Sequence, residues 1–187
     1  YIMITGNSSL YIFLLFSVSL FSTIMAQENN NHDRAFFAAG CFWGVESTFQ
    51  SLDGVVSTTV GYTGGKVKDP SYELVCTGIT GHAEAVEVVY DSKTVSYKQL
   101  LDAFFKLHDP TTLNRQGPDV GTQYRSAIFY NNAEEKKLAE ETINEINESG
   151  KFANKIVTEV ESASNFYSAE DYHQDYYKKR GLTGCAI

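Results

Sequence analysis

Apolar and polar residues follow one another along the chain in blocks that predict alternating strands and helices. Short apolar or strictly alternating runs, typical of strands, occupy residues 34–39, 55–62, 84–90, 124–130 and 156–160. Apolar residues at helical spacing, or a charged helical face, mark residues 41–52, 96–109 and 132–149. This succession predicts an α+β fold, a two-layer sandwich of helices packed on one mixed β-sheet, followed by an irregular C-terminal tail.

The strongest helical signal begins after Ser96. Ser96 and Gln99 form a capping-box pattern, and Pro110 disfavours a helical conformation in Asp109, so the helix should end there. Between these limits one face of the helix carries Tyr97, Leu100, Leu101, Phe104, Phe105 and His108. We expect this face to pack on the sheet.

Residues 1–26 are predicted to be a signal peptide. The run Leu10–Phe21 is apolar but too short for an ordinary membrane-spanning helix, and Ala26 offers a small residue at the cleavage point. No Lys or Arg precedes Ala26, so the usual positive start is missing, and an uncleaved membrane anchor is the alternative. A polar linker, 27–33, and one domain, 34–187, follow. We therefore expect an exported or secreted protein.

Charge and cysteine content narrow the function classes. The formal net charge is −8 and no basic stripe is present, which argues against nucleic acid as a partner. The three cysteines, Cys41, Cys76 and Cys185, are odd in number and form no C-x-x-C pair, which disfavours a disulfide scaffold or a zinc site. A single domain of this kind is expected to be a monomer with a reactive thiol.

Cys41 stands at the turn between a predicted strand and a predicted helix, within the run Gly40–Gly44. Unpaired N–H groups at a helix start favour negative charge, so this position should lower the pKa of the thiol. The alternative is a small buried apolar residue, as free cysteines commonly are. The flanking glycines and the aromatic pair Phe42 and Trp43 favour a reactive thiol, although spacing alone leaves both interpretations open.

The run GCFWGVE at residues 40–46 resembles the active-site signature of the type A peptide methionine sulfoxide reductases. Further collinear matches lie at residues 61–65, 72–78, 81–84, 121–126 and 170–174. The resemblance implies a ferredoxin-like core and thiol-dependent reduction of methionine-S-sulfoxide, both peptide-bound and free, as a repair of oxidised proteins. It also implies no bound cofactor and no metal, with electrons supplied by an external thioredoxin-like dithiol.

Cys41 and Glu84 supply the two groups that sulfoxide reduction requires, a nucleophile for sulfur and a proton for the departing oxygen. Glu84 shares one strand face with apolar residues, so burial should raise its pKa and keep it protonated near neutrality. It can then act as a general acid. Without the Gly-His-Ala-Glu context, a solvent-exposed residue at a strand edge would be the preferred interpretation of Glu84.

The resemblance also implies roles for residues that spacing does not single out. Tyr72 and Tyr124 are similar to the two phenols of the family that hydrogen-bond the sulfoxide oxygen. The substrate-binding residues implied by the match are the aromatic walls Phe42 and Trp43 together with Asp119 and Tyr176.

Recycling requires a second thiol, because the attack leaves a sulfenic acid on Cys41. Cys185 occupies the family's place for this resolving cysteine, in a tail that Gly181 and Gly184 make pliable. Cys76 lies in an apolar stretch and is expected to be an inert buried thiol. Since residues up to Ile187 include no second tail cysteine, the route by which the disulfide reaches the reductant stays open.

Two other functions compete with sulfoxide reduction. A cysteine hydrolase would use His82 or His173 as the base for Cys41, but it leaves Glu84 and Cys185 without a role. A non-catalytic exported module would use the aromatic pocket to grip methionine side chains. Turnover with a dithiol reductant separates these three functions.

Overall fold

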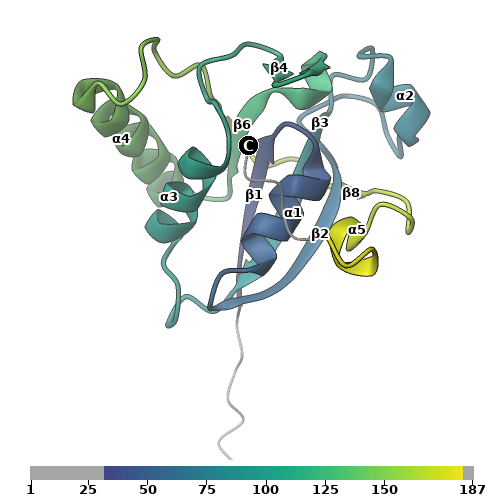
Figure 1. The fold of residues 1–187 in the computed structure, drawn as a ribbon, viewed down its shortest axis with the longest axis horizontal. Coiled ribbons are helices and arrows are strands. Elements are labelled where there is room, and N and C mark those ends of the chain that lie inside the picture. Colours follow the sequence, from purple (N-terminus) through teal and green to yellow (C-terminus); the bar gives the residue numbers. More distant parts are fainter. Residues whose placement is uncertain (1–31, 183–187) are drawn as a thin grey trace, which may run out of the picture. The chain divides into compact units, whose positions relative to one another are not determined.

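Six strands form one mixed sheet in the order β7-β6-β1-β3-β2-β8 (Figure 1). The computed structural model describes residues 32–182, which belong to one unit of the chain, Asn31–Ile187. Neighbouring strands are antiparallel except for the parallel pair β6 and β7. The strands are β1 Asp33–Ala39, β2 Val55–Thr63, β3 Ala83–Tyr90, β6 Ser126–Tyr130, β7 Glu159–Ser162 and β8 Tyr167–Ser168.

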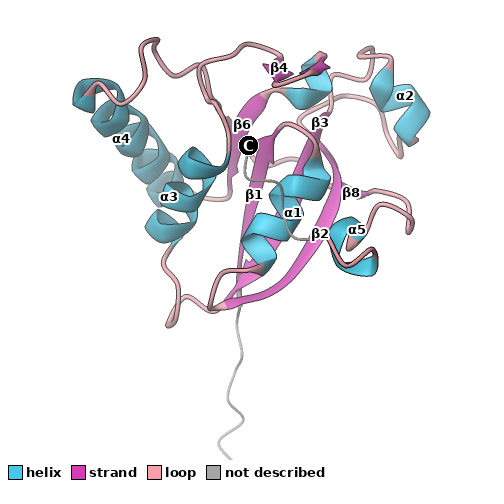
Figure 2. Ribbon diagram, in the orientation of Figure 1, coloured by secondary structure: helices cyan, strands magenta, loops and turns pink. Residues whose placement is uncertain are grey.

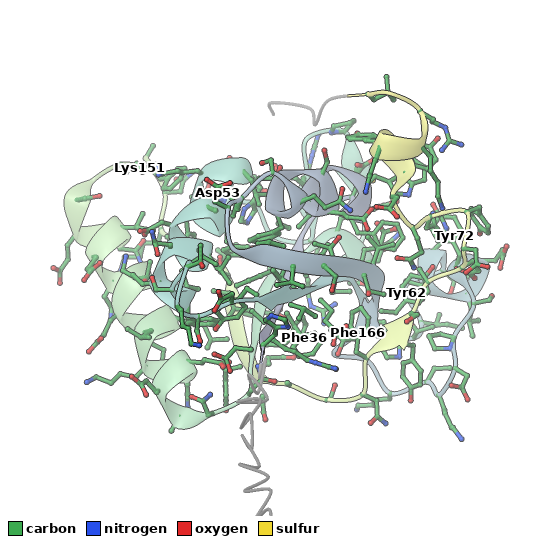
Figure 3. The ribbon with its side chains drawn as sticks, turned by 90° about the horizontal axis from the view of Figure 1, so that it is seen from below. Phe36, Asp53, Tyr62, Tyr72, Lys151 and Phe166 are labelled. Atoms are coloured by element: carbon green, nitrogen blue, oxygen red, sulfur yellow. The ribbon has the colours of Figure 1, made fainter. Side chains whose placement is uncertain are left out.

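Three long helices contribute apolar side chains to the main core on one face of this sheet. They are α1 Phe42–Gln50, α3 Tyr97–Leu107 and α4 Ala133–Ser149. A smaller cluster lies apart from this core, and there Phe166 packs on Phe36 with ring centroids 5.5 Å apart (Figure 3). None of the helices in the described part of the chain is long and apolar enough to cross a membrane.

The central strands have the connectivity β1-α1-β2-β3-α3-β6 and the spatial order β6-β1-β3-β2. This is the split βαβ arrangement of the ferredoxin-like folds. The predicted α+β two-layer sandwich is therefore confirmed. Residues 1–26, for which a signal peptide is predicted, lie outside the described residues, and so does Cys185.

Local sequence signals set the start of α3 and both ends of α4. Ser96 and Gln99 form the complete capping box of α3, with the Ser96 hydroxyl accepting from the Gln99 N–H and the Gln99 side chain accepting from the Ser96 N–H. The Asn132 side chain caps the start of α4, and Gly150 ends it in the left-handed conformation at φ 67°. These ends depend only on residues close in sequence.

Two predicted strand boundaries are wrong. Tyr124 lies in the short 3-10 helix η1 Thr122–Tyr124, where its N–H donates to the Gly121 carbonyl at 3.0 Å, so the strand begins only at Ser126. The strand predicted at 156–160 is β7, which begins only at Glu159, because the N–H groups of Ile156 and Val157 donate to Asn147 and Pro110 and not to a neighbouring strand.

Several short elements were not predicted, namely α2 Tyr72–Cys76, β4 Arg115–Gln116, β5 Asp119–Val120, α5 Tyr176–Lys179 and the edge strand β8. Figure 1 shows β4 and α2 at the end of the sheet where α1 begins. Loops and short elements make up much of this end (Figure 2). They bring side chains from distant parts of the sequence to the start of α1.

Candidate active site

Cys41 occupies the N-cap position of α1, directly after the last strand residue and one glycine. Gly40 has φ +91°, and a Cβ atom there would lie 2.7 Å from the Cβ and Cγ atoms of Gln116. Glycine is therefore required by both the backbone conformation and the space. The Cys41 side chain is partly exposed, and the backbone N–H groups of Trp43 and Gly44 interact favourably with its thiolate.

The Cys41 thiol is nevertheless protonated at neutral pH. Burial raises its pKa to about 12, the charges of Glu84 and Asp119 add to the rise, and the N–H groups of Trp43 and Gly44 only partly oppose it. The predicted lowering of this pKa is wrong. The prediction counted the helix start, whereas the folded protein also removes the thiol from water and places carboxyl groups beside it.

Glu84 is the main buried acid of the site, with 2% of its surface exposed. Its Oε2 accepts a hydrogen bond from the Phe42 N–H at 3.1 Å, which fixes the carboxyl at the start of α1. Burial raises its pKa to about 8; the hydrogen bond lowers it and the charge of Asp119 raises it further. The predicted rise is confirmed, so Glu84 holds a proton at neutral pH.

Tyr72, Tyr124 and Asp119 reach the same site from three short elements. Burial, followed by the charge of Glu84, raises the pKa of Tyr124 to about 12, and Asp119 and Cys41 contribute to the same rise. The pKa of Tyr72 is also raised, by burial and then by its hydrogen bond to the Cys76 thiol, with smaller effects from Glu84 and Tyr124. Both phenols therefore keep their protons and can donate hydrogen bonds.

Of the two aromatic residues after Cys41, only Trp43 is partly exposed. Its ring stacks on Tyr176 with centroids 3.6 Å apart and planes 3° apart, and its Nε1 donates to His173 Nδ1 at 3.0 Å. Phe42 is only 1% exposed and packs in the core against Tyr62 and His173. Trp43 and Tyr176 thus offer an aromatic surface, while Phe42 supports it from within.

Both candidate histidines are buried and engaged elsewhere. His82 Nδ1 accepts from the Gly65 N–H at 3.0 Å, and its Nε2 lies 2.7 Å from the Val67 carbonyl, so the ring ties this loop together. His173 Nδ1 accepts from Trp43, which leaves the proton on Nε2. Neither histidine is among the groups that chiefly set the pKa of Cys41. This arrangement does not favour a cysteine hydrolase.

Cys76 is exposed, so the prediction of a buried thiol is wrong. The helix α2 has only five residues, and of these Val75 alone is fully buried. The apolar run around Cys76 therefore does not lie wholly in the core. Glu170 and Tyr62 were not singled out individually, although they lie in the matched runs 170–174 and 61–65. Glu170 accepts hydrogen bonds from the Tyr62 hydroxyl and from the Tyr72 N–H.

Comparison with known proteins agrees with this geometry. A family model described as "Peptide methionine sulfoxide reductase" matches residues 33–187. The chain is 56% identical to a "Peptide methionine sulfoxide reductase MsrA" of Methanothermobacter thermautotrophicus over 158 residues, which cover 84% of this chain and 94% of that protein. It is 60% identical to the protein of the same description from Methanosarcina acetivorans over 150 residues, 80% of each chain.

Solved structures give the same result. Mxr1 from Saccharomyces cerevisiae in its reduced form matches with a TM-score of 0.77 and 40% identity, over 83% of this chain and 89% of that one. The same yeast protein in complex with Trx2 matches with a TM-score of 0.56 and 31% identity, over 78% of this chain and 84% of that one.

Proposed function

Because this chain belongs to the peptide methionine sulfoxide reductase family, we propose that it reduces methionine-S-sulfoxide, peptide-bound and free, with Cys41 as the nucleophile. The chain is an oxidoreductase of methionine sulfoxide; the stereochemistry and the residue roles form the proposal. The observation that carries it is the pairing of the Cys41 thiol with a buried, protonated Glu84 that is bonded to the next residue of the chain.

In the proposed reaction the Cys41 Sγ attacks the sulfoxide sulfur while Glu84 donates its proton to the sulfoxide oxygen. The oxygen passes to Cys41, which becomes a sulfenic acid, and methionine leaves. Cys41 sulfur loses two electrons and the substrate sulfur gains them. The proton lost by the thiol returns to Glu84, so the step consumes no net proton.

Polarisation of the substrate accounts for attack by a thiol whose pKa is about 12 in the empty site. Hydrogen bonds from Glu84, Tyr72 and Tyr124 to the sulfoxide oxygen withdraw electrons from its sulfur. The partial positive charge that develops on the substrate sulfur favours the thiolate of Cys41. The nucleophile is thus formed only when substrate is bound.

Recycling is proposed to use Cys185, which attacks the Cys41 sulfenic acid, releases water and leaves a Cys41–Cys185 disulfide. A thioredoxin-like dithiol then reduces this disulfide by exchange. The proposal is supported by the likeness to yeast Mxr1, for which a complex with Trx2 has been solved. Cys185→Ser should still release one methionine per enzyme, yet fail to turn over with thioredoxin.

Cys76→Ser is the matched control for this experiment, because it removes the other thiol outside the attack position. We expect it to turn over normally with thioredoxin. Peptide mapping of the oxidised wild type should find Cys41 linked to Cys185 with Cys76 free. A Cys41–Cys76 linkage would reverse the two assignments.

Export is proposed as well, on the apolar run Leu10–Phe21, with membrane anchoring as the alternative. Exported compartments are oxidising, so the dithiol would have to be delivered there by a dedicated donor. Mass spectrometry of the native N-terminus decides the matter: a start near residue 27 supports export after cleavage, and an intact leader contradicts it.

A direct test of the activity uses the reduced protein and a racemic methionine sulfoxide peptide with dithiothreitol. Chiral separation after exhaustive reaction should show that the S-epimer is consumed and the R-epimer is spared. Equal loss of both epimers would contradict the stereochemical assignment, and ester or amide cleavage without reduction would support the hydrolase.

A further inference from the structure

The matched run 170–174 contains a carboxylate that the proposed mechanism does not use. Glu170 Oε1 accepts a hydrogen bond from the Tyr72 N–H at 2.9 Å, and its Oε2 accepts from the Tyr62 hydroxyl at 2.9 Å. Burial raises the pKa of this carboxyl, but three hydrogen-bond donors lower it by more. They are the N–H groups of Tyr72 and Glu170 and the Tyr62 hydroxyl, and the resulting pKa lies below the usual range. Glu170 is therefore ionised at neutral pH and cannot act as an acid.

The first of these bonds fixes the start of α2. Tyr72 is the first residue of this helix, so its N–H has no partner within the helix. A helix of five residues is too short to be stable by itself. Glu170 provides the acceptor for the Tyr72 N–H, although it lies 98 residues later in the sequence. Glu170 thus anchors the backbone of Tyr72 at the start of α2.

The second bond connects Glu170 to the strand beside the catalytic acid. Tyr62 is fully buried in β2, and it is the register partner of Glu84 in β3. Directly opposed residues of antiparallel strands project from the same face of the sheet. Figure 3 shows Tyr62 and Tyr72 on the same side of the molecule. Glu170 therefore spans from α2 to the strand position paired with Glu84.

We propose that Glu170 is a positioning residue for sulfoxide reduction: by tying α2 to Tyr62, it holds the Tyr72 hydroxyl where the sulfoxide oxygen is polarised. The proposal rests on the proposed function, in which Tyr72 donates to that oxygen. Displacement of a reacting group by about 1 Å costs up to about 10²-fold in rate. Loss of Glu170 should therefore slow the chemical step without removing any group that touches substrate.

A double-mutant cycle tests the proposal on the full chain, with single-turnover release of methionine as the readout. Glu170→Ala should slow release roughly 10- to 100-fold, mainly through kcat and less through KM. In a Tyr72→Phe background the same change should have little further effect, because no hydroxyl remains to be positioned. Glu170→Gln keeps a carbonyl oxygen for the Tyr72 N–H and should restore most of the rate.

Gln174→Ala provides the matched control. The Gln174 side chain accepts from the Val60 N–H and donates to the Val60 carbonyl, both at 2.9 Å, so it anchors the same segment to β2 without touching Tyr72. This variant should lower the melting temperature and leave the release rate unchanged. The proposal would be overturned if the double variant slowed release by the product of the two single-variant effects. It would also be overturned if Gln174→Ala slowed release as much as Glu170→Ala does. A wild-type protein without sulfoxide reduction would instead reject the proposed function.

Discussion

Two carboxyl groups are buried at α1, Glu84 against its start and Glu46 within the helix, and their surroundings differ. Glu84 and Glu46 are each 2% exposed, and burial is the largest cause of the raised pKa of both. Glu84 accepts one hydrogen bond, from the Phe42 N–H at the start of the helix. Glu46, on the helix itself, accepts from the Thr58 hydroxyl and interacts with the N–H groups of Asp175 and Tyr176.

The difference matches the roles proposed here, a reactive acid for Glu84 and a structural carboxyl for Glu46. The three donors around Glu46 come from β2 and from the start of α5, so this carboxyl joins elements that have to stay together. Glu84 joins fewer groups and lies beside the Cys41 thiol. A buried carboxyl with few hydrogen-bond donors retains its proton near neutral pH and has it available for transfer.

Among the variants that test this comparison, the one without the Cys41 thiol should show the largest loss of methionine release. Cys41→Ser keeps the shape of the side chain but supplies no anion, so methionine release should be abolished while the fold is retained. Methionine release in a single turnover, together with circular dichroism, measures both. Retained release in this variant would disprove the role of Cys41.

The second-largest effect should come from replacing each carboxyl by a neutral amide, which should slow release far more for Glu84 than for Glu46. Glu84→Gln cannot donate the catalytic proton, so release should slow by about 10²–10⁴-fold. Glu46→Gln should change the release rate by less than about tenfold and instead lower the melting temperature, because it disturbs the contact between α1 and α5. Wild-type release in Glu84→Gln would mean that a tyrosine or water supplies the proton.

The pH dependence of release should be smaller but diagnostic. In the proposed reaction Glu84 acts in its protonated form. Because its pKa is about 8, the rate of the reductive step should decline as the pH rises through about 8. The decline should be absent in Glu84→Gln and present in Glu46→Gln. Rapid-quench measurements between pH 6 and about 10 would reveal it, and an identical decline in Glu84→Gln would assign it to another group.

The smallest expected effect concerns stability. The pKa of Glu84 is raised on folding from 4.5 to about 8, so the stability associated with its protonated form is complete below 4.5 and is lost as the pH rises through about 8. The pKa of Glu46 is raised as well, so it contributes in the same direction. Melting temperatures across this range should decline less steeply in Glu84→Gln than in the wild type. An equally steep decline in Glu84→Gln would mean that another titrating group causes the pH dependence of stability.

Local sequence determined the elements whose stabilising contacts lie close along the chain. The capping box of Ser96 and Gln99, which was predicted, and the left-handed Gly150 after α4 depend on neighbouring residues only. The alternating pattern of β3 also sufficed to place Glu84 on a buried face and to predict its raised pKa. A regular strand repeats its environment every second residue, so the pattern contains this information.

Tertiary structure decided what depends on distant partners. The pKa of Cys41 is raised and not lowered, because burial and the charges of Glu84 and Asp119 come from other elements. Cys76 is exposed since α2 presents mainly Val75 to the core. The Tyr72 N–H finds its acceptor in Glu170, which lies 98 residues later in the chain. Sequence patterns describe a residue's neighbours along the chain, whereas desolvation and charge depend on all neighbours in space.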